Sequence, residues 1–179
     1  MMIRKQLGAC GLTVGLLAAL GGFGPGCAAP QSPSPGRPAP AAGGAKHYAD
    51  SREQLAGIWA AFNAGRLEEA MALADHCTSE YGPLAQILEA GLEKIGKPLP
   101  DGPVDDATKA TIDANAALND VATSHFLKGL CAEKLGHPAE AKAAYALALP
   151  YTYARAWDPK GWFWRPAQAA AMRLKALTP

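Results

Sequence analysis

The chain has 179 residues and a formal net charge of +1; Ala, Gly and Leu dominate it, and β-branched residues are few. This composition favours helix over sheet, and the length suits one domain once a processed N-terminus is set aside. Without residues 1–26, 15 basic side chains stand against 16 acidic ones. No basic patch is evident in the sequence, which argues against nucleic acid as a partner.

The first 27 residues have the layout of a secretory signal. Two basic residues precede an uncharged apolar run, Leu7 to Leu20, which is too short and too Gly-rich for a typical membrane-spanning helix. Cys27 then resembles the lipid-modified cysteine of bacterial lipoproteins, although Gly24-Pro25-Gly26 before it lacks the usual Leu. We predict a lipoprotein signal over residues 1–27 with lipid on Cys27; cleavage near Ala28 without lipid is the alternative.

A proline-rich stretch follows the predicted signal. Residues 29–45 hold five prolines, one charge and no large apolar side chain. Such a composition cannot bury surface, so we predict a disordered linker over residues 28–46. A helical domain is predicted over residues 47–179, and the linker would lift it off the membrane.

The first predicted helices form an αα-hairpin with a tight turn at Gly65. Asp50 or Ser51 is the expected N-cap of the first helix, and the second is expected to end near Tyr81-Gly82-Pro83. The apolar face of the first consists of Leu55, Ile58, Trp59 and Phe62, and that of the second of Leu67, Ala70, Met71, Ala74 and Cys77.

A third helix is predicted from Leu84 to Gly96, followed by a loop at Lys97–Pro103 that three prolines and a glycine impose. Asp105 and Asp106 suit the start of a fourth helix, which either breaks near Asn115 or Asn119 or runs on to Leu135. The expected inner face of the third helix is Leu84, Ile87, Leu88, Gly91 or Leu92, and Ile95.

The last predicted hairpin turns at Gly136, with Pro138 at the first position of its second helix. Pro150 ends that helix, and a final helix is expected over about Pro166 to Leu177. The inner faces of these elements are expected to be Leu127, Leu130, Cys131 and Leu135, then Ala141, Ala144, Tyr145, Ala148 and Leu149, then Ala167, Ala170, Ala171, Leu174 and Leu177.

The first and last hairpins share a sequence pattern. GRLEEAMALADHC, from Gly65 to Cys77, aligns with GHPAEAKAAYALA, from Gly136 to Ala148, with Glu-Ala at the same place in both. The two glycines lie 71 residues apart, which is close to two periods of a repeat of about 34 residues.

This pattern resembles the tetratricopeptide repeat family, in which a Gly at the inter-helix turn is followed by Ala, an aromatic residue and another Ala. Gly136, Ala141, Tyr145 and Ala148 match these positions, and Gly129 matches the small residue of the preceding helix. Small residues let neighbouring helices approach closely, and the larger ones fill the remaining space.

The first copy matches less completely. Gly65 and Ala70 fit, but Ala74 replaces the aromatic residue, and neither copy has the family's early tryptophan. Leu84 to about Asn119 fits a middle repeat by length only. The resemblance implies an all-α fold, a short α-hairpin solenoid of about three hairpins plus a C-terminal capping helix, whose concave face binds a protein. The candidate binding residues on the outward side of the first helices are Asn63, Arg66, Lys128 and Glu133.

Three of the four tryptophans lie in one stretch, ARAWDPKGWFWRP. Within it, Asp158-Pro159-Lys160-Gly161 has the preferred sequence of a type I turn. One interpretation makes the rings a plug on the last hairpin and the capping helix, with one or two of them exposed. The other is a recognition site that stacks on a peptide or glycan. The candidate residues of this site are Trp157, Trp162, Trp164, Arg155 and Tyr151.

The sequence carries no catalytic motif that we recognise. Cys77 and Cys131 remain in the folded part after export, and they either form a disulfide or stay as buried free thiols. The four histidines lack the spacing of a helical metal site. We therefore predict no metal, no cofactor and no enzymatic activity.

From the signal-like N-terminus and the repeat resemblance, we predict a non-catalytic protein-interaction or scaffolding module of the bacterial cell envelope. A lipid would tether it on the periplasmic side of a membrane, with the outer membrane favoured, and its partner would be another envelope protein. The alternative is a glycan or small-ligand binder that uses the C-terminal aromatic cluster, and an enzyme or enzyme subunit of unknown type is the third possibility.

Overall fold

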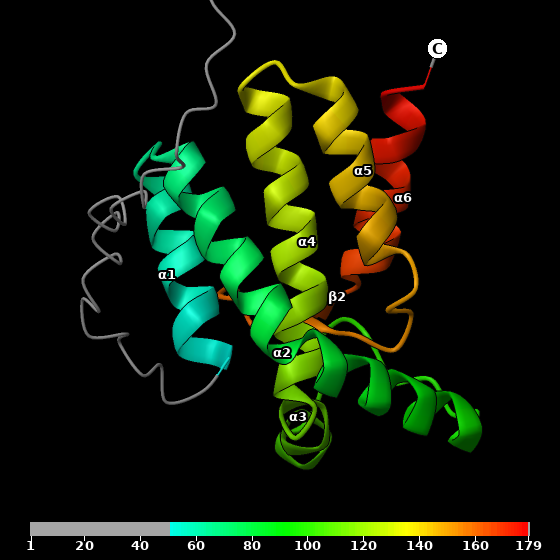
Figure 1. Cartoon of the computed structure of the whole chain (residues 1–179). Helices are drawn as coiled ribbons and strands as arrows, with labels where there is room; N and C mark the ends of the chain where they lie inside the picture. Colours follow the sequence, from blue (N-terminus) through cyan, green and yellow to red (C-terminus); the bar gives the residue numbers. More distant parts are fainter. Residues whose placement is uncertain (1–50, 179) are drawn as a thin grey trace, which may run out of the picture. The chain divides into compact units, whose positions relative to one another are not determined.

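The computed structural model describes residues 51–178. The predicted signal over residues 1–27, lipid on Cys27 and the linker over residues 28–46 lie outside the described residues. The described part is mostly helical with one small two-stranded sheet, which confirms the predicted all-α class (Figure 1). Among the described residues, no helix has the length and apolar character that crossing a membrane requires.

The first predicted hairpin is confirmed. Helix α1 (Ser51–Asn63) is followed by helix α2 (Leu67–Ile95), and the turn between them contains Gly65 at φ 74°. Because a left-handed backbone disfavours any residue with a Cβ, Gly suits this position. The apolar faces of the hairpin meet in a cluster whose buried members are Ile58, Ala61, Ala70, Ala74, Cys77, Leu127 and Cys131.

The predicted break at Tyr81-Gly82-Pro83 is wrong, because α2 continues through Pro83. Figure 1 shows the axis of α2 changing direction partway along, as expected where Pro removes a hydrogen bond within a helix. Beyond the proline, Ala85 is buried, and Leu88 and Leu92 pack on the same cluster. This burial opposes the loss of the hydrogen bond and holds the second half of α2 against the body.

Continuity of α2 also changes which face is buried. The predicted inner residues Leu84, Ile87 and Ile95 are exposed. A helix without a break keeps its phase, so the inner face that includes Tyr81 continues through Ala85, Leu88 and Leu92. The stretch predicted as a middle hairpin is therefore the second half of α2, a loop and a short helix.

That short helix, α3 (Asp106–Asp113), begins as predicted. The Asp105 side chain caps it by accepting a hydrogen bond of 2.7 Å from the Thr108 amide. Helix α4 (Ala116–Lys134) starts after a break at Asn115, one of the two alternatives expected from the sequence.

Helix α4 lies at the centre of the described part. It packs against α1 and α2, against α5 (Pro138–Ala148), and against α6 (Pro166–Ala176). In Figure 1, α1 and the first half of α2 lie on one side of α4, and α5 and α6 lie on the other; the second half of α2 crosses the lower part of α4 in this view and runs towards the α5 side. Ala132, Ala141, Tyr145, Ala148 and Ala170 form the buried cluster among α4, α5 and α6.

The turns of the two hairpins have the same hydrogen bonds. The amide of Gly65 donates to Phe62 and that of Arg66 to Ala61, at 3.0 and 2.9 Å. The amides of Gly136 and His137 donate to Glu133 and Ala132 at the same two distances. Each partner in the second turn lies 71 residues after its counterpart in the first, so the sequence repeat is also a repeat of local structure.

The sheet was not predicted. Strands β1 (Ala156–Asp158) and β2 (Trp162–Trp164) pair antiparallel, with Trp157 opposite Phe163. The predicted turn between them is confirmed, since the Gly161 amide donates to the Asp158 carbonyl at 2.9 Å. Gly161 has φ 99°, as expected for a three-residue hairpin loop.

Candidate binding groove

A groove of about 960 Å³ lies among α1, α3, the first half of α4 and the β1–β2 hairpin. We call it the tryptophan groove because Trp59, Trp157 and Trp164 all line it. Its helical walls come from α3 and from the first helix of each hairpin, and its remaining wall comes from the C-terminal aromatic stretch. Of the residues predicted for the two kinds of site, Asn63 of the first and Trp157, Trp164 and Arg155 of the second line this groove. Its other lining residues include Arg52, Asn63, Lys109, Asp113, Asn119, Asp120, Thr123, Arg155, Asp158, Lys160 and Phe163.

The aromatic residues of the β1–β2 hairpin divide between core and surface. Phe163 is buried with Leu99 and Ile112, and Trp164 packs edge-on against Phe126 of α4, with ring centroids 5.3 Å apart. Trp157 lies across Phe163 at 4.9 Å but remains 44% exposed. An exposed indole face beside a groove is available for stacking on a ligand.

The plug interpretation is thus correct in part. Two rings are exposed to solvent, those of Trp157 and Trp162. The buried ring, Phe163, covers α3 and the loop after α2 instead of the last hairpin. Successive residues of a strand point to opposite faces, which separates Phe163 from Trp162, whereas Trp157 lies opposite Phe163 in the register and covers its ring from the solvent side.

Charged side chains of α1 and α3 meet at the edge of the groove. The Lys109 ammonium lies 2.6 Å from the Asp113 carboxylate and 4.9 Å from the centroid of a Trp157 ring. Arg52 donates to the Asp113 backbone carbonyl at 2.6 Å. Lys109 therefore holds the Trp157 ring by a cation–π contact while Asp113 balances its charge.

Buried polar residues of α4 line the inner part of the groove. Asn119 donates to the Ile112 carbonyl at 2.9 Å and accepts from the Arg155 amide at 2.7 Å. Asp120 accepts from the Ser51 hydroxyl at 2.6 Å, and Thr123 donates back to the Asn119 carbonyl. Since these groups bond to the protein itself, they fix the shape of the groove and leave ring faces and edge charges for recognition.

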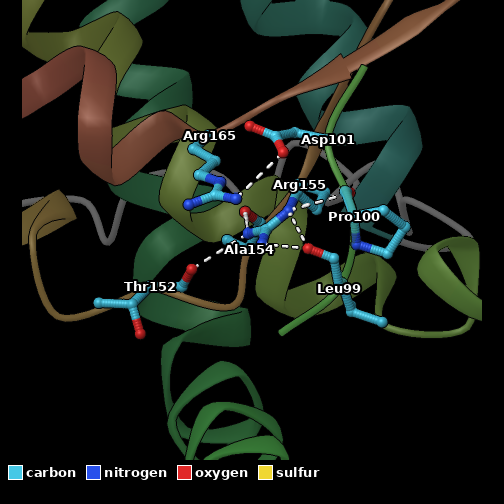
Figure 2. Close-up of polar contacts among 7 residues, drawn as sticks. All are labelled: Leu99, Pro100, Asp101, Thr152, Ala154, Arg155 and Arg165. Atoms are coloured by element: carbon cyan, nitrogen blue, oxygen red, sulfur yellow. Dashed lines mark hydrogen bonds and ion pairs between the residues drawn. The ribbon is translucent and has the colours of Figure 1, made fainter. Parts of the chain in front are cut away.

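Arg155 was a predicted ligand-binding residue, and the structure places it in a different setting. Its side chain is 1% exposed, and its guanidinium donates to four backbone carbonyls (Figure 2). Burial lowers the pKa of this guanidinium, with the nearby Arg165 charge as a second cause. The contacts join the loop after α2 to the start of the hairpin; the four carbonyls belong to Leu99, Pro100, Thr152 and Ala154.

Two further contacts hold the same loop to the hairpin. Gly102 exchanges backbone hydrogen bonds of 2.8 and 2.9 Å with Phe163. Arg165 donates to the Asp101 carboxylate at 3.0 Å, as Figure 2 also shows. The hairpin that carries Trp157 is therefore attached to the body through its backbone as well as through its rings.

The other predicted binding residues are spread over the molecule. Asn63 is exposed and lines the tryptophan groove, whereas Arg66 is bound to Glu69 at 2.8 Å. Lys128 is bound to Asp75 at 2.6 Å, and Glu133 accepts a hydrogen bond from the Tyr145 hydroxyl. Tyr151 is buried against α2 and α4. The structure does not bring these five residues together.

Sequence reasoning missed Trp59, Lys109 and Asn119 as groove residues. A signal for Asn119 was present: α4 carries four buried polar residues in an otherwise apolar stretch, namely Asn119, Asp120, Thr123 and Ser124. Buried polar side chains at helical spacing indicate a face that meets loops or a polar site instead of a plain core. The helical periodicity predicts Trp59 for the core face of the first helix, and Trp59 packs partly against that core while it also lines the groove.

Of the two alternatives for the cysteines, the structure shows the free thiols. Cys77 and Cys131 are both free and buried within one cluster of the described part. Burial is the main cause that raises the pKa of each thiol to about 11. Such thiols are protonated at neutral pH and poorly nucleophilic.

Among residues 51–178, no group of His, Cys, Asp or Glu side chains is arranged to hold a metal ion. The tryptophan groove offers ring faces, amides and charges, which suit binding. In the comparisons with known proteins, no family model, curated protein or solved structure matches the chain.

Proposed function

We propose that residues 51–178 form a non-catalytic protein-interaction module that binds a peptide segment of its partner in the tryptophan groove. The observation that carries this proposal is the composition of the groove walls. The first helices of both hairpins and the exposed ring of Trp157 face one space of about 960 Å³. A groove of this size accommodates a few side chains of an extended or helical segment.

The duplicated turns support an architecture similar to tetratricopeptide repeats. Gly65 and Gly136 begin equivalent turns, and Ala70 and Ala141 are buried at equivalent positions after them. In this proposal α6 covers the end of the second hairpin, as a capping helix does in a solenoid. The concave side of the short array is the tryptophan groove.

Site-directed crosslinking tests the proposed site. A photoreactive amino acid at Asn63 or Lys160, both of which line the groove, is expected to capture a protein from an intact envelope extract. The matched control carries the same photoreactive amino acid at Met172, a residue of α6 that is 68% exposed. The purified partner should then bind at least about tenfold more weakly to Trp157→Ala. Equal capture from all three positions, or unchanged affinity, would exclude the groove.

One observation favours a second candidate function, a glycan binder. Trp157 and Trp162 are both exposed, and a sugar ring can stack on an indole face. Titration with soluble cell-wall glycan fragments is expected to shift the tryptophan emission if this function is the correct one. An unchanged spectrum with saturating fragments, together with groove-specific protein capture, favours the protein-interaction module.

The location in the envelope is also part of the proposal. We propose export, lipid on Cys27 and a tether through residues 28–46, all on the basis of the sequence pattern. Mass spectrometry of the mature N-terminus tests this directly. A diacylglyceryl-modified Cys27 supports the anchor, and an unmodified N-terminus after residue 27 contradicts it.

A further inference from the structure

A second groove, of about 690 Å³, runs along α2 from Asp75 to Glu93 and is bordered by His125 of α4 and by the end of α5 with the residues that follow it. We call it the α2–α5 groove. It shares no lining residue with the tryptophan groove. Its apolar lining includes Pro83 and Ala90 of α2, and Leu147 and Pro150 at the end of α5. Leu147 is 56% exposed, so an apolar side chain faces solvent at this edge.

The charges that line the α2–α5 groove are of one sign. Asp75, Glu89 and Glu93 contribute carboxylates, and none of the described residues that line the groove is Lys or Arg. Lys128, outside the lining, neutralises Asp75 at 2.6 Å. Glu89 accepts hydrogen bonds of 2.7 and 2.8 Å from the amide and hydroxyl of Thr152, which are neutral donors and leave its charge in place.

The remaining titratable group in the groove does not offset this charge. His125 stacks on Tyr151 with ring centroids 6.0 Å apart. Burial, followed by the nearby Lys128 charge, lowers the pKa of His125 to about 4, so its ring is neutral at neutral pH. The groove therefore presents a negative potential around an apolar surface.

The apolar surface extends onto the neighbouring face of α2. Ile87, one turn after the lining residue Pro83, is 70% exposed. Large exposed apolar residues close to an apolar groove are typical of a surface that meets a partner.

We propose that the α2–α5 groove binds a basic amphipathic segment of a protein, with apolar side chains on Leu147 and Ile87 and Lys or Arg beside Glu89 and Glu93. The charge of the groove determines this choice. Nucleic acid and anionic lipid would be repelled by the carboxylates, whereas a cationic segment is attracted and its apolar face buries Leu147. This surface is additional to the tryptophan groove and does not depend on it.

Fluorescence anisotropy with two labelled 18-residue helical peptides tests the proposal on the full chain. One peptide places Leu on one face and Lys on the other, and its counterpart has Glu at every Lys position. The Lys peptide is expected to bind, and more weakly at high salt. Leu147→Asn and Glu93→Lys should each weaken the binding of the Lys peptide at least about tenfold, since the first removes an apolar contact without adding charge and the second replaces a negative charge by a positive one.

Matched controls carry the same chemical changes elsewhere. Met172→Asn changes another exposed apolar residue, and Glu68→Lys changes an exposed acid in the first turn of α2. Both should bind the Lys peptide as the unchanged protein does. Ile87→Asn provides a second apolar test if circular dichroism shows that Leu147→Asn is unfolded.

Three results would overturn the proposal. The first is equal affinity for the Lys and Glu peptides. The second is an affinity for the Lys peptide that is unchanged in both Glu93→Lys and the folded apolar variant. The third is a loss of affinity for the Lys peptide in Trp157→Ala that matches the loss in Glu93→Lys. The last result would assign the peptide to the tryptophan groove. If the tryptophan groove binds no partner, the comparison of the two peptides and the effects of the α2–α5 groove variants can still be measured. The two proposals can therefore fail independently of each other.

Discussion

Gly129 of α4 and Tyr145 of α5 pack so closely that a Cβ atom on Gly129 would lie 2.3 Å from Tyr145 Cε1. Real Cβ atoms do not approach a ring this closely, so any larger residue forces the tyrosine or the helices to move. Tyr145 is also fixed at its other end, because its hydroxyl donates to Glu133. The separation between α4 and α5 is therefore set by a glycine on one helix and an aromatic ring on the other.

Gly129→Ala should destabilise the protein by about 1–3 kcal/mol, as overpacking of a core does. Gly91→Ala is the matched control, since it lies within α2 and has no atom within 4 Å of an added Cβ. That substitution should stabilise by up to about 1 kcal/mol through helix propensity. Urea denaturation measures both; equal effects would show that the contact with Tyr145 has no special role.

The Gly129–Tyr145 contact also shows what the sequence predicts well. Both residues belong to the repeat pattern, which also predicts the two hairpin turns correctly. It does so because Gly65 and Gly136 have positive φ, a local backbone requirement that favours glycine. Such requirements depend on a few neighbouring residues. They are visible without knowledge of the rest of the fold.

Predictions failed where distant contacts decide the structure. Gly82-Pro83 is a strong local helix breaker, yet α2 continues because Ala85, Leu88 and Leu92 pack on α4 and on the segment before the hairpin. The β1–β2 hairpin likewise depends on pairing of Gly102 with Phe163, 61 residues apart in the chain. The candidate site was predicted in part: Asn63, Trp157 and Trp164 line the groove, whereas Arg155 contributes to it only as a buried side chain that supports the hairpin.

Stability should decrease as the pH falls from about 6.5 towards 4, in part because of His125. Its pKa is lowered from 6.5 to about 4 in the folded protein, mainly by burial, so the unfolded state takes up a proton first. Above pH 6.5 the ring is neutral in both states and burying it has no protonation cost. As the pH falls from 6.5 to 4, protonation favours the unfolded state and the free energy of unfolding decreases. The expected loss is at most roughly 3 kcal/mol.

Chemical denaturation at several pH values, compared between the unchanged protein and His125→Gln, isolates this contribution. The difference in unfolding free energy between the two proteins should change with pH in the window from 6.5 to 4. The carboxylates titrate in both proteins and cancel in the comparison. Parallel pH profiles would show that His125 is already protonated in the folded state near pH 6.

The thiols of Cys77 and Cys131 should resist labelling in the folded protein at pH 8. Both are buried, and burial raises the pKa of each to about 11, so little thiolate is present and reagents cannot reach it. Unfolding without a reductant should expose both to iodoacetamide, and peptide mass mapping distinguishes them from other cysteines. A peptide that stays unlabelled after unfolding would show a disulfide that the described structure lacks.

Arg155→Met should loosen the β1–β2 hairpin more than the helices. The substitution keeps an apolar stem but leaves the carbonyls of Leu99, Pro100, Thr152 and Ala154 without the guanidinium that now bonds to them. Losing buried hydrogen bonds to a charged donor costs about 2–4 kcal/mol. Because the rings of Trp157 and Phe163 depend on this attachment, the groove should lose its aromatic wall before α4 and α5 unfold.

Hydrogen exchange and tryptophan emission together test that order. Amides in residues 99–103 and 156–164 should exchange faster in Arg155→Met, while those of α4 and α5 stay protected, and the emission should shift to longer wavelength. Arg165→Met is the comparison, since its guanidinium is partly exposed and its bond to Asp101 lies at the surface. That variant should change the exchange little. Uniformly faster exchange in Arg155→Met would mean that this arginine supports the whole domain, and that the hairpin and the helices unfold as one unit.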